Sequence, residues 1–374
     1  MAPTDSGRSG PVTVWPIYTG TRRPHDRIRL LPEAPNWRAF DGGPPLSPPQ
    51  RLVPTSARRL GTLDAPDSSV RTPSDKEVQM VNAALFLRRP LLVTGKPGTG
   101  KSTLAYLIAE ELGLGPVLRW PITSRTTLLE GLYRYDAIGR LREENLRRLR
   151  ERPAAPAGEP TPPGDEPTSS SADPAGTDIG RHLRLGPLGT ALLPYTTPRM
   201  LLIDEIDKSD MDLPNDLLNV FEEGEYSIEE LQRLPEETGP VPVMIADPGG
   251  HANISSGHVR CRAFPFVLLT SNGEREFPPA FLRRCLRLDL DAPGRTQVEE
   301  IITAHLGPEA TATAGHLVNS FLAKREISEV TTDQLLNAVY LATAGSRHEG
   351  RSPEEVASLN EVAHAVLRPL SGPE

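Results

Sequence analysis

The sequence feature that most constrains the fold is the stretch 91–104, Leu-Leu-Val-Thr-Gly-Lys-Pro-Gly-Thr-Gly-Lys-Ser-Thr-Leu. The apolar run Leu91–Val93 predicts a buried parallel strand, and the amphipathic run Thr103–Leu112 predicts a helix just after it. Glycines between a strand and a helix let backbone N–H groups point inward at phosphate oxygens. The stretch therefore predicts a phosphate-binding loop; the alternative is a Gly/Pro-rich turn that matches the pattern by chance.

We expect the whole loop to bind a nucleoside triphosphate, ATP, together with Mg²⁺. Lys101 would place a positive charge on the β- and γ-phosphates, and Ser102 would offer a hydroxyl to the metal ion. The start of the following helix favours the same anion. The expected nucleotide-binding residues in the loop are Gly95, Lys96, Pro97, Gly98, Thr99, Gly100, Lys101, Ser102 and Thr103.

Composition narrows the class of protein. The net charge of −8 makes the chain a poor general binder of nucleic acid. No run approaches the ~18 apolar residues of a membrane span, and the start of the chain lacks a signal-peptide pattern. The two cysteines, Cys261 and Cys285, lack metal-ligand spacing and are expected to be buried thiols in a reducing cytosol. We therefore expect a cytoplasmic protein.

The pattern of elements predicts three regions. Residues 1–73 are rich in Pro and Arg and predict a largely disordered arm, in which Trp37 and Phe40 could anchor the arm on its own domain or on a partner. Strands alternate with helices over 74–292, which predicts an α/β core with a disordered insertion at 151–178. Helices alone follow over 293–374 and predict a small all-α domain.

Three segments between the main strands are harder to assign. Gly131–Leu141 has two tyrosines, two glycines and alternating character, which predicts a small hairpin or a pore-type insertion. Ile179–Leu193 predicts a helix that leads into a loop. Tyr226–Arg262 predicts mixed short strands and turns.

Two acids end a second buried strand. Asp204 and Glu205 follow four apolar residues, 200–203. Asp204 could hold Mg²⁺ opposite Ser102, and Glu205 could polarise a water for attack on the γ-phosphate. The alternative is that these acids only cap the strand, but a phosphate loop upstream favours the chemical interpretation.

Three further residues complete the expected site. Asn272 ends the next strand and could orient the attacking water; the alternative is an ordinary loop Asn. Arg283 and Arg284 follow on a short helix, and a guanidinium suits the charge that develops on a transferring phosphoryl group. The alternative is a salt-bridged surface pair, but their position downstream of Asn272 favours a finger that reaches a neighbouring subunit.

These pieces, in this order, resemble the AAA+ ATPases and, within them, the MoxR family. The motifs are Gly95–Ser102 as Walker A, Leu201–Asp207 as Walker B, Thr270–Asn272 as sensor 1 and Pro279–Arg284 as the arginine-finger box. The resemblance implies a P-loop AAA+ three-layer sandwich with a parallel central sheet, followed by a small all-α lid domain.

The resemblance also implies an assembly and a role. It implies a ring, usually a hexamer, with ATP between subunits and Arg283 or Arg284 reaching the neighbour's γ-phosphate. Gly131–Leu141 and Tyr226–Arg262 look like the family's two inserts, which would face the pore or a partner. The implied partner is a protein with a von Willebrand factor A domain, and the implied role is chaperone-like remodelling or maturation.

The sequence departs from the family at the lid, where Asp333 stands in place of a sensor-2 arginine. Slow or partner-dependent hydrolysis would follow. Two functions therefore stay open: an active remodelling ATPase, and a nucleotide-dependent switch or scaffold of a multi-protein, defence-type complex. A small-molecule kinase fits worse, because it leaves Asn272 and the two arginines unexplained.

Overall fold

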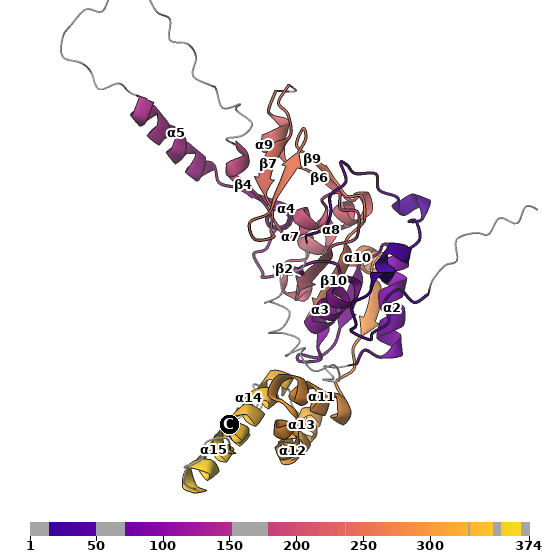
Figure 1. The fold of residues 1–374 in the computed structure, drawn as a ribbon, viewed down its shortest axis with the longest axis vertical. Helices are drawn as coiled ribbons and strands as arrows, with labels where there is room; N and C mark the ends of the chain where they lie inside the picture. Colours follow the sequence, from indigo (N-terminus) through magenta and orange to yellow (C-terminus); the bar gives the residue numbers. More distant parts are fainter. Residues whose placement is uncertain are drawn as a thin grey trace, which may run out of the picture.

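A five-stranded parallel sheet forms the centre of the larger domain, and a helical domain follows it in the chain (Figure 1). The computed structural model describes residues 15–49, 72–151, 179–235, 237–327, 330–346 and 353–367. The strand order is β11 (Leu286–Asp289), β1 (Leu91–Thr94), β10 (Phe266–Ser271), β5 (Met200–Asp204) and β2 (Leu118–Pro121). Each neighbouring pair is parallel, so the carboxyl ends of all the strands meet at one edge.

Side chains of this sheet alternate between two apolar cores. Leu91 and Val93 of β1 lie in one core, whereas Leu92 lies in the other. The covering helices are α2 (Asp75–Leu87) and α3 (Lys101–Leu112) on the first face, and α7 (Pro187–Ala191), α8 (Asp212–Glu223) and α10 (Pro279–Arg284) on the second. Because helices cover both faces, the domain is the three-layer α/β sandwich that the sequence predicted.

Local signals in the sequence account for the main elements. A Ser followed three residues later by a Glu is the sequence pattern of a capping box, and Ser74 and Glu77 form such a box at the start of α2. The apolar runs that predicted strands form β1, β5 and β10, which are almost entirely buried. Buried parallel strands read as continuous apolar runs, so these were the easiest elements to find.

Two smaller sheets lie beside the core, and here two predictions were wrong. Gly131–Leu141 is not a hairpin: its strand β3 (Tyr133–Tyr135) pairs with β4 (Leu183–Leu185), far along the chain, and its end belongs to helix α5 (Ala137–Glu151). Ile179–Leu193 contains β4 as well as α7. The additional elements are α4 (Leu128–Leu132), β3 (Tyr133–Tyr135), α5 (Ala137–Glu151), β4 (Leu183–Leu185), η3 (Ile206–Lys208), β6 (Glu225–Ser227), α9 (Glu229–Gln232), β7 (Val241–Met244), β8 (His251–Ile254) and β9 (His258–Arg260).

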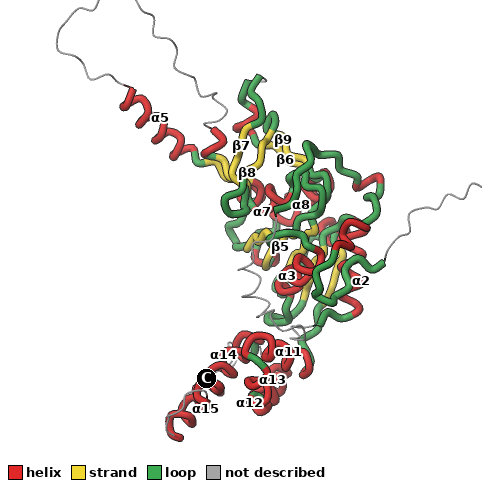
Figure 2. Tube along the Cα trace, in the orientation of Figure 1, coloured by secondary structure: helices red, strands yellow, loops and turns green. Residues whose placement is uncertain are grey.

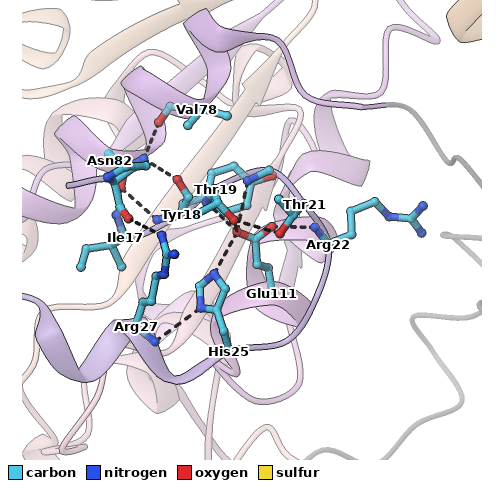
Figure 3. Close-up of polar contacts among 12 residues, drawn as sticks. Ile17, Tyr18, Thr19, Thr21, Arg22, His25, Arg27, Val78, Asn82 and Glu111 are labelled. Atoms are coloured by element: carbon cyan, nitrogen blue, oxygen red, sulfur yellow. Dashed lines mark hydrogen bonds and ion pairs between the residues drawn. The ribbon is translucent and has the colours of Figure 1, made fainter. Parts of the chain in front are cut away.

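The N-terminal arm differs most from expectation, because residues 15–49 are folded onto the sandwich. Ile17 and Tyr18 are buried in the core beneath α2 and α3. Figure 3 shows how this part of the arm is held. The Asn82 side chain accepts hydrogen bonds from the N–H groups of Ile17 and Tyr18 at 2.7 and 2.9 Å and donates one to the Tyr18 carbonyl.

The second anchor in Figure 3 is Glu111, whose side chain is fully buried. Its Oε1 accepts from the Thr19 N–H and hydroxyl at 2.6 and 2.7 Å and from the Gly20 N–H at 3.1 Å. Its Oε2 accepts from the Arg22 N–H at 2.8 Å, and His25 Nε2 lies 3.2 Å from Oε1. The arm thus wraps a buried carboxylate with its own backbone N–H groups.

The arm continues across the domain. It carries the short helices η1 (Asp26–Leu30) and η2 (Asn36–Arg38). Phe40 stacks on Phe264 of the core, with ring centroids 5.5 Å apart, whereas Trp37 is 79% exposed. Of the two aromatic residues expected to anchor the arm, Phe40 therefore packs on the domain and Trp37 does not.

The helical domain has its own apolar core, formed by residues such as Phe321 and Val339. Its helices, red below the sandwich in Figure 2, are α11 (Arg295–Leu306), α12 (Pro308–Thr313), α13 (Gly315–Ile327), α14 (Thr332–Ser346) and α15 (Pro353–Val366). The predicted disordered insertion lies outside the described residues, apart from Glu151 at the end of α5. Across the described ranges, no helix has the length and apolar character needed to span a membrane.

Candidate nucleotide site

The glycine-rich loop connects β1 to α3 at the carboxyl edge of the sheet. Gly98 has φ of +78°, and a Cβ there would lie 2.8 Å from the Thr332 backbone nitrogen, so both the turn and the close approach require glycine. Lys101 Nζ donates to the carbonyl oxygens of Gly95 and Lys96, at 2.6 and 3.0 Å. The loop therefore already holds a positive charge at its centre, where it would meet phosphate oxygens.

Burial lowers the pKa of Lys101, although the nearby carboxylates of Asp207, Glu205 and Asp204 oppose this shift. A partly buried ammonium surrounded by acids is stabilised in its charged form by those acids. Lys101 and these three carboxylates therefore lie close to one another at the end of the sheet.

The structure brings Ser102 and Asp204 together from opposite ends of the expected site. Ser102 Oγ donates to Asp204 Oδ1 at 2.6 Å, and Thr270 Oγ1 donates to the same oxygen at 2.9 Å. A hydroxyl beside a carboxylate is the type of oxygen donor set that Mg²⁺ prefers. The residues present therefore fit the metal ion that the sequence implied.

Arg119 of β2 is a site residue that the sequence reasoning missed. Its Nε and Nη2 donate to Asp204 Oδ2 at 3.0 and 2.7 Å. Burial alone would raise the pKa of Asp204, but the hydrogen bonds from Ser102, Arg119 and Thr270 outweigh it and lower that pKa. Asp204 is therefore held as a carboxylate with both oxygens occupied.

The only sequence signal for Arg119 was its place in an alternating strand. In Leu-Arg-Trp-Pro of β2, Leu118 and Trp120 are buried, whereas Arg119 and Pro121 are exposed. Such a position normally faces solvent. Its contact with Asp204 depends on β2 lying next to β5, which only the strand order reveals.

Glu205 adopts a left-handed backbone conformation, with φ of +63°. This conformation is uncommon for a residue other than glycine, and the hydrogen bond from Glu205 N–H to Thr270 Oγ1, at 2.8 Å, helps to fix it. Its carboxylate is 44% exposed and pairs with Lys208 Nζ at 2.7 Å. The strained turn therefore presents the Glu205 carboxylate at the rim of the site rather than inside it.

Asn272 is also at this edge, but among the residues that the structure describes its side chain makes no hydrogen bond to the loop. Its backbone N–H donates to Asp207 Oδ2 at 2.8 Å, and its amide Nδ2 donates to Glu274 Oε1 at 3.3 Å. Asp207 also accepts from the Glu274 N–H at 3.2 Å. Buried Asp207, which the sequence reasoning did not single out, thus fixes the turn that carries Asn272.

Arg283 and Arg284 lie at the end of α10, and within the described part of the chain their side chains make no hydrogen bond or ion pair to the loop. Arg284 pairs with Glu222 of α8, and this hydrogen bond raises the pKa of Arg284. The Arg283 side chain is exposed and has no hydrogen bond or ion pair among the residues that the structure describes. The two arginines are therefore not equivalent.

The helical domain touches the loop through the start of α14. Thr332 Oγ1 donates to the Gly98 carbonyl at 2.7 Å. A small pocket between the domains is lined on its apolar side by Pro97, Pro293 and Phe321. Asp333 follows Thr332 in the first turn of α14, so the lid meets the phosphate loop with a hydroxyl and a helix start.

A family model described as AAA domain (dynein-related subfamily) matches residues 90–285, which is more than half of the chain. The chain belongs to this family. The match begins just before β1 and runs to the end of α10, so it includes the loop, Asp204, Thr270 and both arginines. The AAA fold and its association with ATP binding and hydrolysis therefore apply to this domain. No curated protein matches the chain.

Proposed function

We propose that this AAA protein is a MoxR-type ATPase that hydrolyses ATP with Mg²⁺, assembles into a ring and remodels a protein partner. The observation that carries the proposal is the 2.6 Å contact between Ser102 Oγ and Asp204 Oδ1, next to Lys101 at the start of α3. A hydroxyl, a carboxylate and a lysine at one loop are the parts that P-loop enzymes use to hold a triphosphate and its metal ion.

Each of these side chains has a distinct task in the proposed mechanism. Lys101 would exchange its two carbonyl partners in the loop for phosphate oxygens. Ser102 and Asp204 would hold Mg²⁺, which neutralises charge on the β- and γ-phosphates when bound. Glu205 would leave Lys208 and accept a proton from the attacking water, a role suited to a carboxylate at the rim of the site.

The remaining residues support a shared site between subunits. Neither Arg283 nor Arg284 contacts the loop of its own subunit, so a positive charge from α10 would have to act on a neighbouring site. A ring, of hexameric type by family resemblance, would supply that arrangement. The partner expected from the same resemblance carries a von Willebrand factor A domain.

Replacing Glu205 by Gln tests the proposal. The amide keeps the size of the side chain but cannot take a proton, so ATP turnover should fall at least ~10²-fold while ATP binding stays near the wild-type level. Lys101→Ala is the control that should lose binding itself. Undiminished turnover in Glu205→Gln would exclude this residue as the base, and unaffected ATP binding in Lys101→Ala would exclude the loop as the nucleotide site.

Two observations favour a second function, that of a nucleotide-dependent switch or scaffold with little hydrolysis. Asp333 occupies the lid position where the family often has an arginine, and Arg284 is tied to Glu222. Both features lower the positive charge available to the transferring phosphoryl group. Turnover measured with and without a candidate partner separates the two functions, because a switch would bind ATP and assemble without a rise in turnover.

A further inference from the structure

A second pocket lies at the carboxyl end of β2, outside the nucleotide site. Its volume is about 490 Å³, within the range of sites that hold small ligands or a few side chains. Apolar groups of Trp120, Leu185 and Pro187 contribute to its lining. The pocket is therefore formed where the edge of the central sheet meets β4 and the start of α7, elements that are labelled in Figure 1.

Two glycines shape this pocket. A Cβ at Gly131 would lie 2.3 Å from Trp120 Cη2, and a Cβ at Gly186 would lie 2.3 Å from the Gly131 carbonyl oxygen. The backbone at Gly186 therefore packs directly on the backbone at Gly131, and the backbone at Gly131 packs directly on the Trp120 ring. A side chain at either glycine would not fit. The packing beneath the pocket is therefore tight rather than a loose surface irregularity.

Three arginines from three different segments surround this apolar lining. They are Arg125 of the loop after β2, Arg134 of β3 and Arg184 of β4. Arg134 and Arg184 are directly opposite each other in the antiparallel pair. Like charges at directly opposite positions destabilise a sheet, so this pair weakens the fold unless an anion joins it.

The pocket offers little internal compensation for these charges. Among the described residues that line it, the one carboxylate is that of Glu130, which meets Arg134 at 4.0 Å with both side chains well exposed. Within the described ranges, the side chains of Arg125 and Arg184 make no hydrogen bond or ion pair. Three cations against one anion leave a local excess of positive charge on a chain whose net charge is −8.

We infer that this pocket binds an acidic segment of a protein partner, with an apolar side chain against Trp120 and carboxylates on the three arginines. An apolar lining beneath a cationic rim is complementary to such a segment. A nucleic acid fits less well, because its phosphate track would extend beyond the pocket onto an acidic protein and Glu130 would repel it. The inference rests on the proposed partner-remodelling role and adds the chemistry of the partner.

The pocket is physically connected to the nucleotide site through β2. Trp120 lies beside the pocket, whereas the preceding residue, Arg119, binds the Asp204 carboxylate. The N–H of Ile122, at the start of the Arg125 loop, donates to the Asp204 carbonyl at 3.0 Å. A segment bound in the pocket would therefore contact β2, the strand whose end donates hydrogen bonds to both the side chain and the backbone carbonyl of Asp204.

Fluorescence anisotropy with the full chain tests the inference. The probe is a short labelled peptide of Asp and Glu residues around one Phe, and the matched peptide has Asn and Gln in place of the acids. Arg125→Glu, Arg134→Glu and Arg184→Glu should each raise the Kd of the acidic peptide about tenfold or more. Arg287→Glu, an exposed charge reversal on β11 at the opposite edge of the sheet, should leave this Kd unchanged.

A second readout separates a binding role from a structural one. Arg184→Glu places opposite charges across the strand pair and leaves the ion pair between Arg134 and Glu130 in place, so its melting temperature should be equal to or above that of the wild type even though the peptide binds more weakly. A protein that merely unfolds at the pocket would melt at a lower temperature. Binding of the acidic peptide should also weaken as salt is added.

The outcomes are distinguishable from failure of the ATPase proposal, because peptide binding needs no hydrolysis and should persist in Glu205→Gln. The inference is overturned if the acidic peptide does not bind, or if Arg287→Glu weakens binding as much as the pocket variants. It is likewise overturned if the Asn/Gln peptide binds equally well. Single-stranded DNA that binds with the same dependence on the three arginines would identify the pocket as a nucleic-acid site instead.

Discussion

Replacing Glu111 by Gln should release the N-terminal arm from the sandwich. The buried carboxylate accepts from three backbone N–H groups, one hydroxyl and His25. Glutamine has nearly the same shape, but one of its two terminal atoms is an NH₂ group. In either orientation of the amide, this donor must face N–H groups of the arm, so at least one hydrogen bond is replaced by a repulsive contact.

The size of the effect follows from these contacts. A hydrogen bond to a charged group contributes about 1.5–3 kcal/mol and a neutral one about 0.5–1.5 kcal/mol. Loss of the bond to Arg22 N–H, with weakening of the bonds to Thr19 and Gly20, sums to about 5 kcal/mol. Because networked bonds are not additive, we expect the docked arm to lose about 3–5 kcal/mol. The sandwich itself would remain folded, since the loss cannot exceed the free energy of docking.

Hydrogen exchange and limited trypsin digestion measure this release. In the variant, the amides of Thr19, Gly20 and Arg22 should exchange much faster, and cleavage after Arg22 should accelerate. Glu223→Gln, which changes an exposed carboxylate on α8, is the matched control and should leave both measurements unchanged. If Glu111→Gln exchanged these amides at the wild-type rate, the carboxylate would not be what holds the arm, and Asn82 or the burial of Tyr18 would carry the docking instead.

Four further predictions concern the nucleotide site. Arg119→Gln should let the protein bind Mn²⁺ without nucleotide at least tenfold more tightly, as followed by electron paramagnetic resonance, because a cation no longer competes for Asp204. Because the pKa of Asp204 is lowered in the folded protein, the ionised carboxylate stabilises the fold fully above the ordinary aspartate pKa of about 4, and this stabilisation is lost as the pH falls through the folded-state pKa. Asp204→Asn should remove this contribution to the pH dependence of the free energy of unfolding, measured with urea. Arg283→Ala should lower kcat of the assembled protein by about 10³-fold or more and Arg284→Ala by less, since Arg284 is already paired with Glu222; equal losses would contradict the distinction. Thr332→Ala should speed exchange of loop amides in the nucleotide-free protein, whereas unchanged exchange would show that the lid contact does not order the loop.

The parts of the fold that the sequence predicted are those with local signals. A pattern of only a few neighbouring residues identifies each of three features: the phosphate loop, the capping box of Ser74 and the apolar strand Met200–Ile203. The pairing of Ser102 with Asp204 also followed, because the loop that leads to Ser102 leaves the carboxyl end of β1, Asp204 ends β5, and the carboxyl ends of parallel strands share an edge. The fold class and the position of the site needed no long-range information beyond this rule.

The parts that the sequence did not predict depend on partners far along the chain. Ile17 N–H bonds Asn82, 65 residues away, and Thr19 bonds Glu111, 92 residues away. Asn82 and Glu111 resemble ordinary helix residues until their burial is known. A polar residue at a buried position of an amphipathic helix was the one available signal, and it does not say which segment satisfies it.

The hydrogen bond from the Thr332 hydroxyl to the Gly98 carbonyl couples movement of the phosphate loop to the orientation of α14. The helix has 15 residues and is therefore about 22 Å long, so a tilt of about 10° at its first turn displaces its far end by about 4 Å. A shift of the phosphate loop too small to rearrange the sandwich is thus enlarged at the far end of α14 and, through its packing on α15, at the outer surface of the helical domain. In a ring, that outer surface is where one subunit could transmit its nucleotide state to the next.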